Sequence, residues 1–115
     1  RVRIETYRIL RDTELARKIK QLHKNMCQLC GLAISLPGGA SYSEAHHIKP
    51  LGNPHGGSDV SENIIVLCPN HHAQLDFGAL KLEPREIRSI QGHHIGAGFI
   101  EYHNEVVYGQ SRAKP

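Results

Sequence analysis

A length of 115 residues predicts one domain with a modest core, since only 39% of the residues are hydrophobic and tryptophan is absent. Three cysteines cannot all pair, which argues against a disulfide framework, and nine histidines favour a metalloprotein of the reducing cytoplasm. A net charge of +3 is compatible with nucleic acid, and no apolar run is long enough to indicate a membrane span.

The N-terminal part of the chain predicts a short strand and then a helix. Residues 1–7 alternate apolar and charged side chains, as an exposed strand does. A helix is expected over about residues 12–25, with Asp12 or Thr13 as the N-cap. Its expected apolar stripe comprises Leu15, Ile19, Leu22 and Met26. The basic residues off this stripe favour a solvated face over a phosphate-binding one.

The centre of the chain predicts a strand, a long loop, a second strand and a helix, preceded by a cysteine knuckle at residues 26–31. The strands are expected over about residues 42–48 and 63–68. The loop between them is rich in Pro, Gly, Asn and Ser. Pro69 suits the first helical position, and Gly78 is expected to close that helix.

The C-terminal extension, residues 80–115, is expected to contain a β-hairpin over residues 99–109. The turn is placed at His103 and Asn104, because Asn tolerates the positive φ that such turns require. The predicted fold class is therefore α+β. A small metal-stabilised core at about residues 27–78 is flanked by the N-terminal helix and the C-terminal hairpin, in one domain of residues 1–115.

A closed metal site is predicted from two ligand pairs. Cys27 and Cys30 form a C-x2-C pair, and Cys68 and His71 form a C-x2-H pair. Four such ligands suit tetrahedral zinc and leave no position open for water, so the zinc would be structural. In the alternative interpretation, the cysteines are small buried hydrophobic residues and His71 lies on the surface.

The remaining polar residues predict a second, open metal site. His72 and Asp76 are spaced i, i+4 and share a helix face. Adjacent strand residues point to opposite faces, so His46 and His47 must have different functions. An ion held by His72, Asp76 and one strand histidine would keep positions free for water and substrate. On spacing alone, Asp76 is as well explained by an ion pair within its helix.

The segments "EAHHIKP", "GGSDVSENIIVLC" and "CPNHHAQLDFG" resemble the HNH nuclease family. The resemblance spans about residues 27–78 and includes a histidine, an asparagine 16 positions later, a histidine nine after that, and the zinc ligands. It is strongest to the HNH domains of McrA-like modification-dependent restriction enzymes. The fold that it implies is a ββα-metal core.

The resemblance implies a role for each residue of the second site. His47 would be the general base, and His46 and His72 would hold a divalent ion such as Mg²⁺, Mn²⁺ or Ni²⁺, with Asp76 added as a ligand by its spacing from His72. Asn63 would hold the loop and orient His47, although as a residue entering a strand it also suits a turn. Glu44, on the strand face of His46, would either support a ligand or be solvated.

The leading functional hypothesis is a metal-dependent DNA endonuclease of the restriction type, which contacts DNA mostly through its phosphates. An upstream reader domain would choose the target, and a homodimer would allow cleavage of both strands. The competing hypothesis is a non-catalytic zinc ribbon that binds nucleic acid or protein. A ribonuclease or colicin-like toxin on the same core is a third. The remaining histidines are assigned no catalytic function: His23, His55, His93, His94 and His103.

Overall fold

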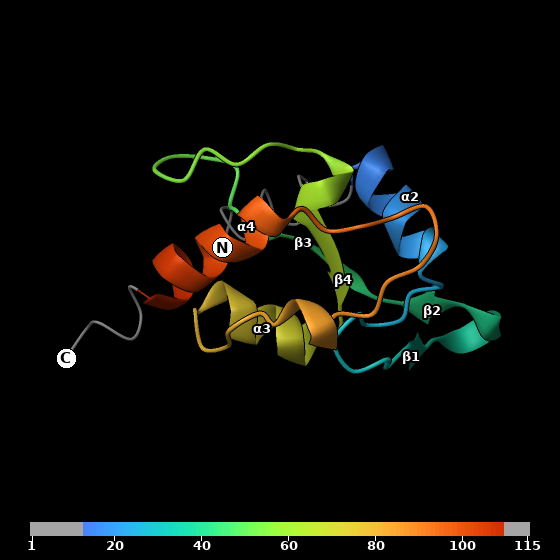
Figure 1. Ribbon diagram of the computed structural model, residues 1–115. Coiled ribbons are helices and arrows are strands. Elements are labelled where there is room, and N and C mark those ends of the chain that lie inside the picture. The colour runs from blue at the N-terminus through green and yellow to red at the C-terminus, as the bar shows by residue number, and fades with distance from the viewer. Residues whose placement is uncertain (1–12, 110–115) are drawn as a thin grey trace.

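The structure is a computed structural model that describes residues 13–109 (Figure 1). Two antiparallel hairpins and three α-helices make up its regular elements. Strands β1 (Ile34–Ser35) and β2 (Ser41–Tyr42) form one hairpin, and β3 (Glu44–His47) and β4 (Ile64–Leu67) form the other. The fold is the expected α+β arrangement. The strand expected over residues 1–7 lies outside the described residues.

The β3–β4 hairpin is the centre of the fold, and its two faces bury different clusters. His46 pairs with Ile65 and His47 with Ile64, so successive pairs point to opposite faces. Ile64 and Val66 pack with Ala16 and Ile19 of helix α2 (Glu14–Leu22). Ile65 and Leu67 pack on the other face. The adjacent histidines are therefore directed to different sides, as the alternation predicts.

Helix α2 begins at Thr13, whose hydroxyl oxygen accepts a hydrogen bond from the backbone N–H of Ala16 at 3.1 Å. Its buried face differs from the predicted stripe. Ala16 and Ile19 are buried, whereas Leu22 and Met26 are exposed. Met26 lies beyond the helix, because the chain turns through positive φ at Lys24 and Asn25.

Helix α3 (Pro69–Asp76) is bounded as predicted, with Pro69 in its first turn and Gly78 after its last. Gly78 has φ of +68° and donates to the carbonyl of Leu75, while Ala79 donates to that of Gln74. These two bonds form a Schellman cap, which glycine permits because it adopts a positive φ without strain. Leu75 is fully buried and fixes the helix against the face of Ile65 and Leu67.

The long loop between β3 and β4 is held by Asn63, the last residue of a short 3-10 turn (Ser61–Asn63). Its carboxamide accepts from the N–H of Lys49 at 2.8 Å and donates to the carbonyls of Lys49 and Ser58, both at 2.9 Å. Asn63 is fully buried, so all three bonds are shielded from water. The two ends of the loop are thereby tied together.

The prediction of a C-terminal β-hairpin is wrong, because residues 97–107 are helical. Helix α4 (Ala97–Tyr102) continues into a π-helical turn (His103–Val107), and His103 has αR dihedral angles. Ile100 and His103 are buried three positions apart, a helical spacing that the apparent alternation concealed. Asn104 does not turn the chain. Its carboxamide bonds both backbone groups of Leu82 at 2.8 Å.

In Figure 1 helix α4 lies above α3 on the left of the view, and the β1–β2 hairpin projects to the right. The C-terminal segment joins this core through Leu82 and Ile100, which pack with Ile65 and Leu67. In the described part of the chain, no helix has the length and apolar character needed to cross a bilayer.

Candidate active site

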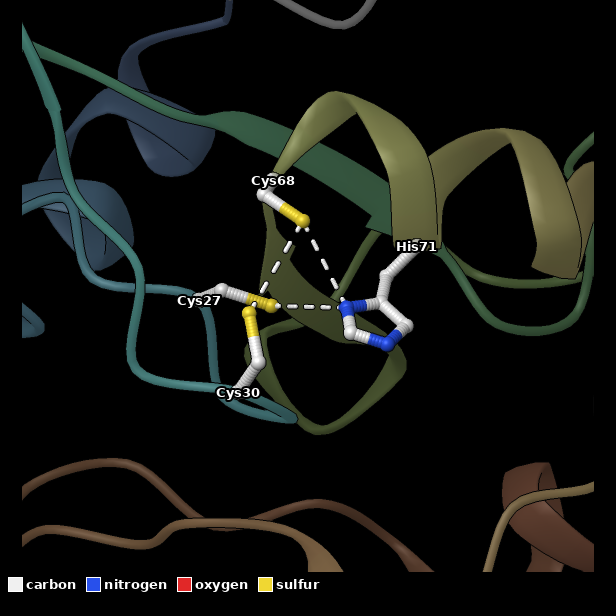
Figure 2. Close-up of side chains that lie close together, drawn as sticks. All are labelled: Cys27, Cys30, Cys68 and His71. Atoms are coloured by element: carbon white, nitrogen blue, oxygen red, sulfur yellow. Dashed lines mark hydrogen bonds between the residues drawn. The ribbon is translucent and has the colours of Figure 1, made fainter.

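Four of the predicted ligands converge on one point between the knuckle and the start of α3 (Figure 2). The Nδ1 atom of His71 lies 3.4 Å from the Sγ of Cys68 and 3.6 Å from that of Cys27. The Sγ atoms of Cys30 and Cys68 are 3.9 Å apart. Tetrahedral zinc with ordinary bond lengths requires about 3.8 Å between two sulfurs and about 3.6 Å between sulfur and nitrogen. The donor set fits zinc in kind and in size.

Backbone contacts hold the knuckle in place. Gln28 is buried and exchanges hydrogen bonds with Val66 of β4, through its backbone N–H and its side-chain oxygen. Burial alone raises the pKa of the Cys27 thiol, but hydrogen bonds from backbone groups of Cys68, Cys30 and Leu29 outweigh it and leave that pKa below its usual range. A thiol with a lowered pKa is readily present as the thiolate that zinc binds.

A second cluster joins β3 to α3. The Nδ1 atom of His46 lies 3.3 Å from one carboxylate oxygen of Asp76, and the Nε2 atom of His72 lies 3.4 Å from the other. Two ligands at about 2.1 Å from a common ion lie about 3.0–3.4 Å apart, depending on the coordination geometry. Two imidazoles and a carboxylate therefore fit a divalent ion, and three ligands leave coordination positions for water or substrate.

Glu44 supports this second cluster from the same face of β3. Its Oε1 lies 2.5 Å from the Nδ1 of His72, and the hydroxyl of Tyr42 donates to its Oε2 at 2.6 Å. A carboxylate at Nδ1 keeps the hydrogen there and leaves the Nε2 lone pair toward Asp76. Of the two interpretations of Glu44, the structure matches the supporting one.

His47 lies on the opposite face of β3 and is 8% exposed. Its Nε2 atom is 2.8 Å from the Oδ1 of Asp59, which lies in the loop that Asn63 holds. Asn63 contacts Lys49, two positions after His47, and does not bond the imidazole itself. Asn63 therefore fixes the backbone on both sides of this His–Asp pair.

A family model described as HNH endonuclease matches residues 27–83, the segment that carries both clusters. The chain belongs to the HNH endonuclease family. It is 37% identical over 70 residues to the type IV methyl-directed restriction enzyme EcoKMcrA of Escherichia coli (strain K12), a match that covers 59% of this chain and 24% of that enzyme. The fold is similar to that of the modification dependent TagI restriction endonuclease. For that structure the TM-score is 0.76 with 34% identity, over 83% of this chain and 38% of TagI.

The chain thus spans less than two-fifths of the length of either relative. As a member of this family, it carries an HNH endonuclease domain. Family members use divalent metals, in agreement with the donor set at His46, His72 and Asp76.

Ligand spacing and the HNH resemblance together led to nine site residues, and the structure brings them together in three groups. Four form the sulfur-rich cluster, three form the open cluster, and His47 and Asn63 lie on the loop side of β3. Asp59 was not among the predicted site residues. Its position in "GGSDVSEN", four residues before Asn63, was the available signal, but only the folded loop shows that it meets His47.

Four of the five histidines without an assigned function have structural partners. His23 and His93 are buried, and their Nε2 and Nδ1 atoms are 2.7 Å apart, a pairing that the sequence did not indicate. Burial and the neighbouring His93 lower the pKa of His23 to about 4. His103 is fully buried and bonds the carbonyl of Leu80 at 2.7 Å, and burial lowers its pKa. His55 bonds the hydroxyl of Tyr102 at 2.5 Å.

Proposed function

We propose that this chain is a metal-dependent DNA endonuclease domain that hydrolyses phosphodiester bonds by a one-metal HNH mechanism. The observation that carries the proposal is the open cluster of His46, His72 and Asp76. Within it, His46 directly precedes His47 in the sequence. A zinc ribbon that only binds nucleic acid has no use for a second ligand set of oxygen and nitrogen atoms beside a closed Cys3His site.

The site residues divide the chemistry of phosphodiester hydrolysis between them. His47 takes a proton from the water that attacks phosphorus, and Asn63 holds the loop so that His47 keeps its position. His46, His72 and Asp76 hold the divalent ion, which when bound neutralises charge on the scissile phosphate and on the departing 3′ oxygen. The products of this mechanism carry 5′-phosphate ends.

The two metal sites would take different ions. Three thiols and one imidazole form a closed tetrahedral set, which suits structural zinc. The open site offers one carboxylate and two imidazoles, which suits Mg²⁺, Mn²⁺ or Ni²⁺. Glu44 is proposed as a positioning residue for this ion, because it orients His72.

Residues 1–115 are proposed to form a single nuclease domain with its core at about 27–78. A core of this size grips DNA mainly through backbone phosphates and offers few groups for reading bases. The domain is therefore proposed to bind DNA with a relaxed sequence preference. A reader domain outside residues 1–115 would choose the target. Because one active site cuts one strand, a homodimer is the proposed state for double-strand cleavage.

The test is a supercoiled-plasmid nicking assay of the wild type and His47→Ala with Mg²⁺, Mn²⁺, Ni²⁺ or EDTA. Nicking by the wild type is expected with one or more of these ions, together with a loss of about 10²- to 10⁴-fold in His47→Ala. Equal nicking by both proteins, or nicking that survives EDTA, would overturn the mechanism. DNA binding without nicking under any of these conditions would favour the non-catalytic zinc ribbon, and a parallel assay on RNA separates the two substrates.

A further inference from the structure

Asp59, in the loop between β3 and β4, contacts His47 but has no function in the proposed mechanism. We propose that Asp59 is a positioning residue for the general base: its carboxylate accepts the Nε2–H of His47, which leaves the lone pair of the neutral ring on Nδ1. This inference rests on the proposed function, because it assumes that His47 takes the proton. It assigns the proton-accepting atom as Nδ1.

The hydrogen bond itself is the first support. The 2.8 Å distance between Nε2 of His47 and Oδ1 of Asp59 is that of a good hydrogen bond, and a carboxylate can only accept. It is the only side-chain hydrogen bond of His47 within residues 13–109. Because His47 is 8% exposed, water does not readily replace this partner.

The loop is built so that Asp59 stays at this distance. Asn63 donates to the carbonyl of Ser58, the residue before Asp59, and contacts both backbone groups of Lys49, two residues after His47. One buried side chain thus connects the two segments that carry the acid and the base.

Gly57 allows the same two segments to approach. A Cβ atom there would lie 2.0 Å from the carbonyl oxygen of Lys49, and the N–H of Gly57 donates to the carbonyl of Pro50 at 2.7 Å. Any side chain would push the loop outward, so glycine is required for this contact. The close backbone packing at Gly57 thus helps to determine the position of Asp59, which lies two residues later in the sequence.

In the proposed reaction, Asp59 stays ionised from the first step to the last. The attacking water loses a proton to Nδ1 of His47, and its oxygen forms the new bond to phosphorus. The bond from phosphorus to the 3′ oxygen breaks with its electron pair on that oxygen, which takes a proton from solvent water to become the 3′ hydroxyl. His47 becomes an imidazolium whose Nε2–H already points to the Asp59 carboxylate, which stabilises the new charge. Without Asp59, the neutral ring would distribute its hydrogen between the two nitrogens and lose a fixed orientation.

The ordinary alternative is a surface ion pair that contributes little. The Asp59 side chain is 44% exposed, and pairs with an exposed partner contribute little to folding. This exposure makes the proposal testable, because Asp59 variants should fold. A positioning role then requires a loss of rate that is out of proportion to any change in stability.

The experiment compares Asp59→Asn and Asp59→Ala with Glu62→Gln as a matched control. Glu62→Gln removes one negative charge from the same loop. In the wild type, the only hydrogen bond of the Glu62 carboxylate within the described residues is from the hydroxyl of the neighbouring Ser61. Folding is checked by thermal melting and zinc content. Plasmid nicking is measured at saturating protein, with DNA affinity measured separately by fluorescence anisotropy.

A fall of about 10- to 100-fold in the nicking rate is expected for both Asp59 variants, with DNA affinity unchanged and Glu62→Gln at the wild-type rate. Rates within twofold of the wild type, while His47→Ala is inactive, would overturn the Asp59 role and leave the proposed function intact. An active His47→Ala would overturn the proposed function itself.

The tautomer of His47 provides a readout that is independent of activity. With ¹⁵N-labelled histidine, at a pH where the ring is neutral, NMR should show hydrogen on Nε2 in the wild type and in Glu62→Gln. Asp59→Ala should give a mixture of tautomers, and His47→Gln identifies the resonance. A wild-type spectrum with hydrogen on Nδ1, or no change in Asp59→Ala, would overturn the inference whatever the nicking rates.

Discussion

Two adjacent residues of α3, His71 and His72, belong to sites of opposite design. His71 completes a set of three thiols, with neighbouring ligand atoms 3.4–3.9 Å apart and no room for another ligand. His72 joins His46 and Asp76 in a set of three that leaves an ion accessible. Successive helical residues point about 100° apart, so one turn of helix can supply both sites. This small fold thus has one site that serves its stability and a second site that is accessible for chemistry.

The supporting contacts of the two sites differ in the same way. The sulfur-rich site is stabilised by backbone groups, chiefly through Gln28 and β4. Side-chain carboxylates instead support two imidazoles of the proposed active site: Glu44 bonds His72 of the open site, and Asp59 bonds His47 on the opposite face of β3. Backbone support fixes position alone, whereas a carboxylate also determines which nitrogen carries hydrogen.

The largest expected effect comes from breaking the sulfur-rich site. Cys27→Ser should lose zinc and most of the folded state, because a structural zinc contributes energy comparable to the whole stability of a domain, about 5–15 kcal/mol. Zinc analysis and thermal melting followed by circular dichroism test this. A variant that keeps the zinc content and melting temperature of the wild type would contradict the assignment.

Breaking the open site should instead spare the fold. His72→Ala is expected to keep its zinc and its melting temperature but to lose about 10²-fold or more in nicking rate, since one ligand of the ion is gone. The matched control is the adjacent variant His71→Ala, which should lose zinc. Equal zinc loss in both variants would show that the two histidines do not have separate functions.

A smaller effect is expected when the ligands remain and only their support is removed. Glu44→Gln and Glu44→Ala should weaken binding of Mn²⁺ by about 10- to 100-fold, because His72 loses the carboxylate that orients it. Isothermal titration calorimetry of the zinc-loaded protein measures this without any DNA. The control Glu83→Gln, which contacts only Lys81 at 3.9 Å among the ion pairs of the described residues, should bind Mn²⁺ like the wild type. Unchanged affinity in both Glu44 variants would assign that residue to the solvated surface.

The core of the fold and both clusters could be predicted because their signals are local. Pro69 and Gly78 mark the beginning and end of α3 through a fixed φ and a positive φ, respectively. The i, i+4 spacing placed His72 beside Asp76, and strand alternation separated His46 from His47. Each of these inferences needs only the geometry of one element.

The features that were missed depend on contacts between distant segments. Asp59 reaches His47 only because Gly57 and Asn63 fold the loop back on itself. Residues 97–107 have both an alternating and a helical apolar pattern, and burial of Ile100 and His103 against the core selects the helix. Tertiary packing decides such cases, and spacing along the chain does not encode it.

The smallest expected effect concerns a buried histidine pair that belongs to neither metal cluster. Because the pKa of His23 is lowered to about 4 in the folded protein, the unfolded chain binds a proton more readily between about pH 6.5 and pH 4. The free energy of unfolding should therefore fall as the pH drops through this window, by up to roughly 3 kcal/mol from this group. In His23→Gln, which keeps a neutral hydrogen-bonding group opposite His93, the loss should be smaller. Urea unfolding at several pH values measures the slope, with the exposed His94→Gln as the control that should follow the wild type. Identical slopes in all three proteins would show that this pair does not contribute to the acid sensitivity of the fold.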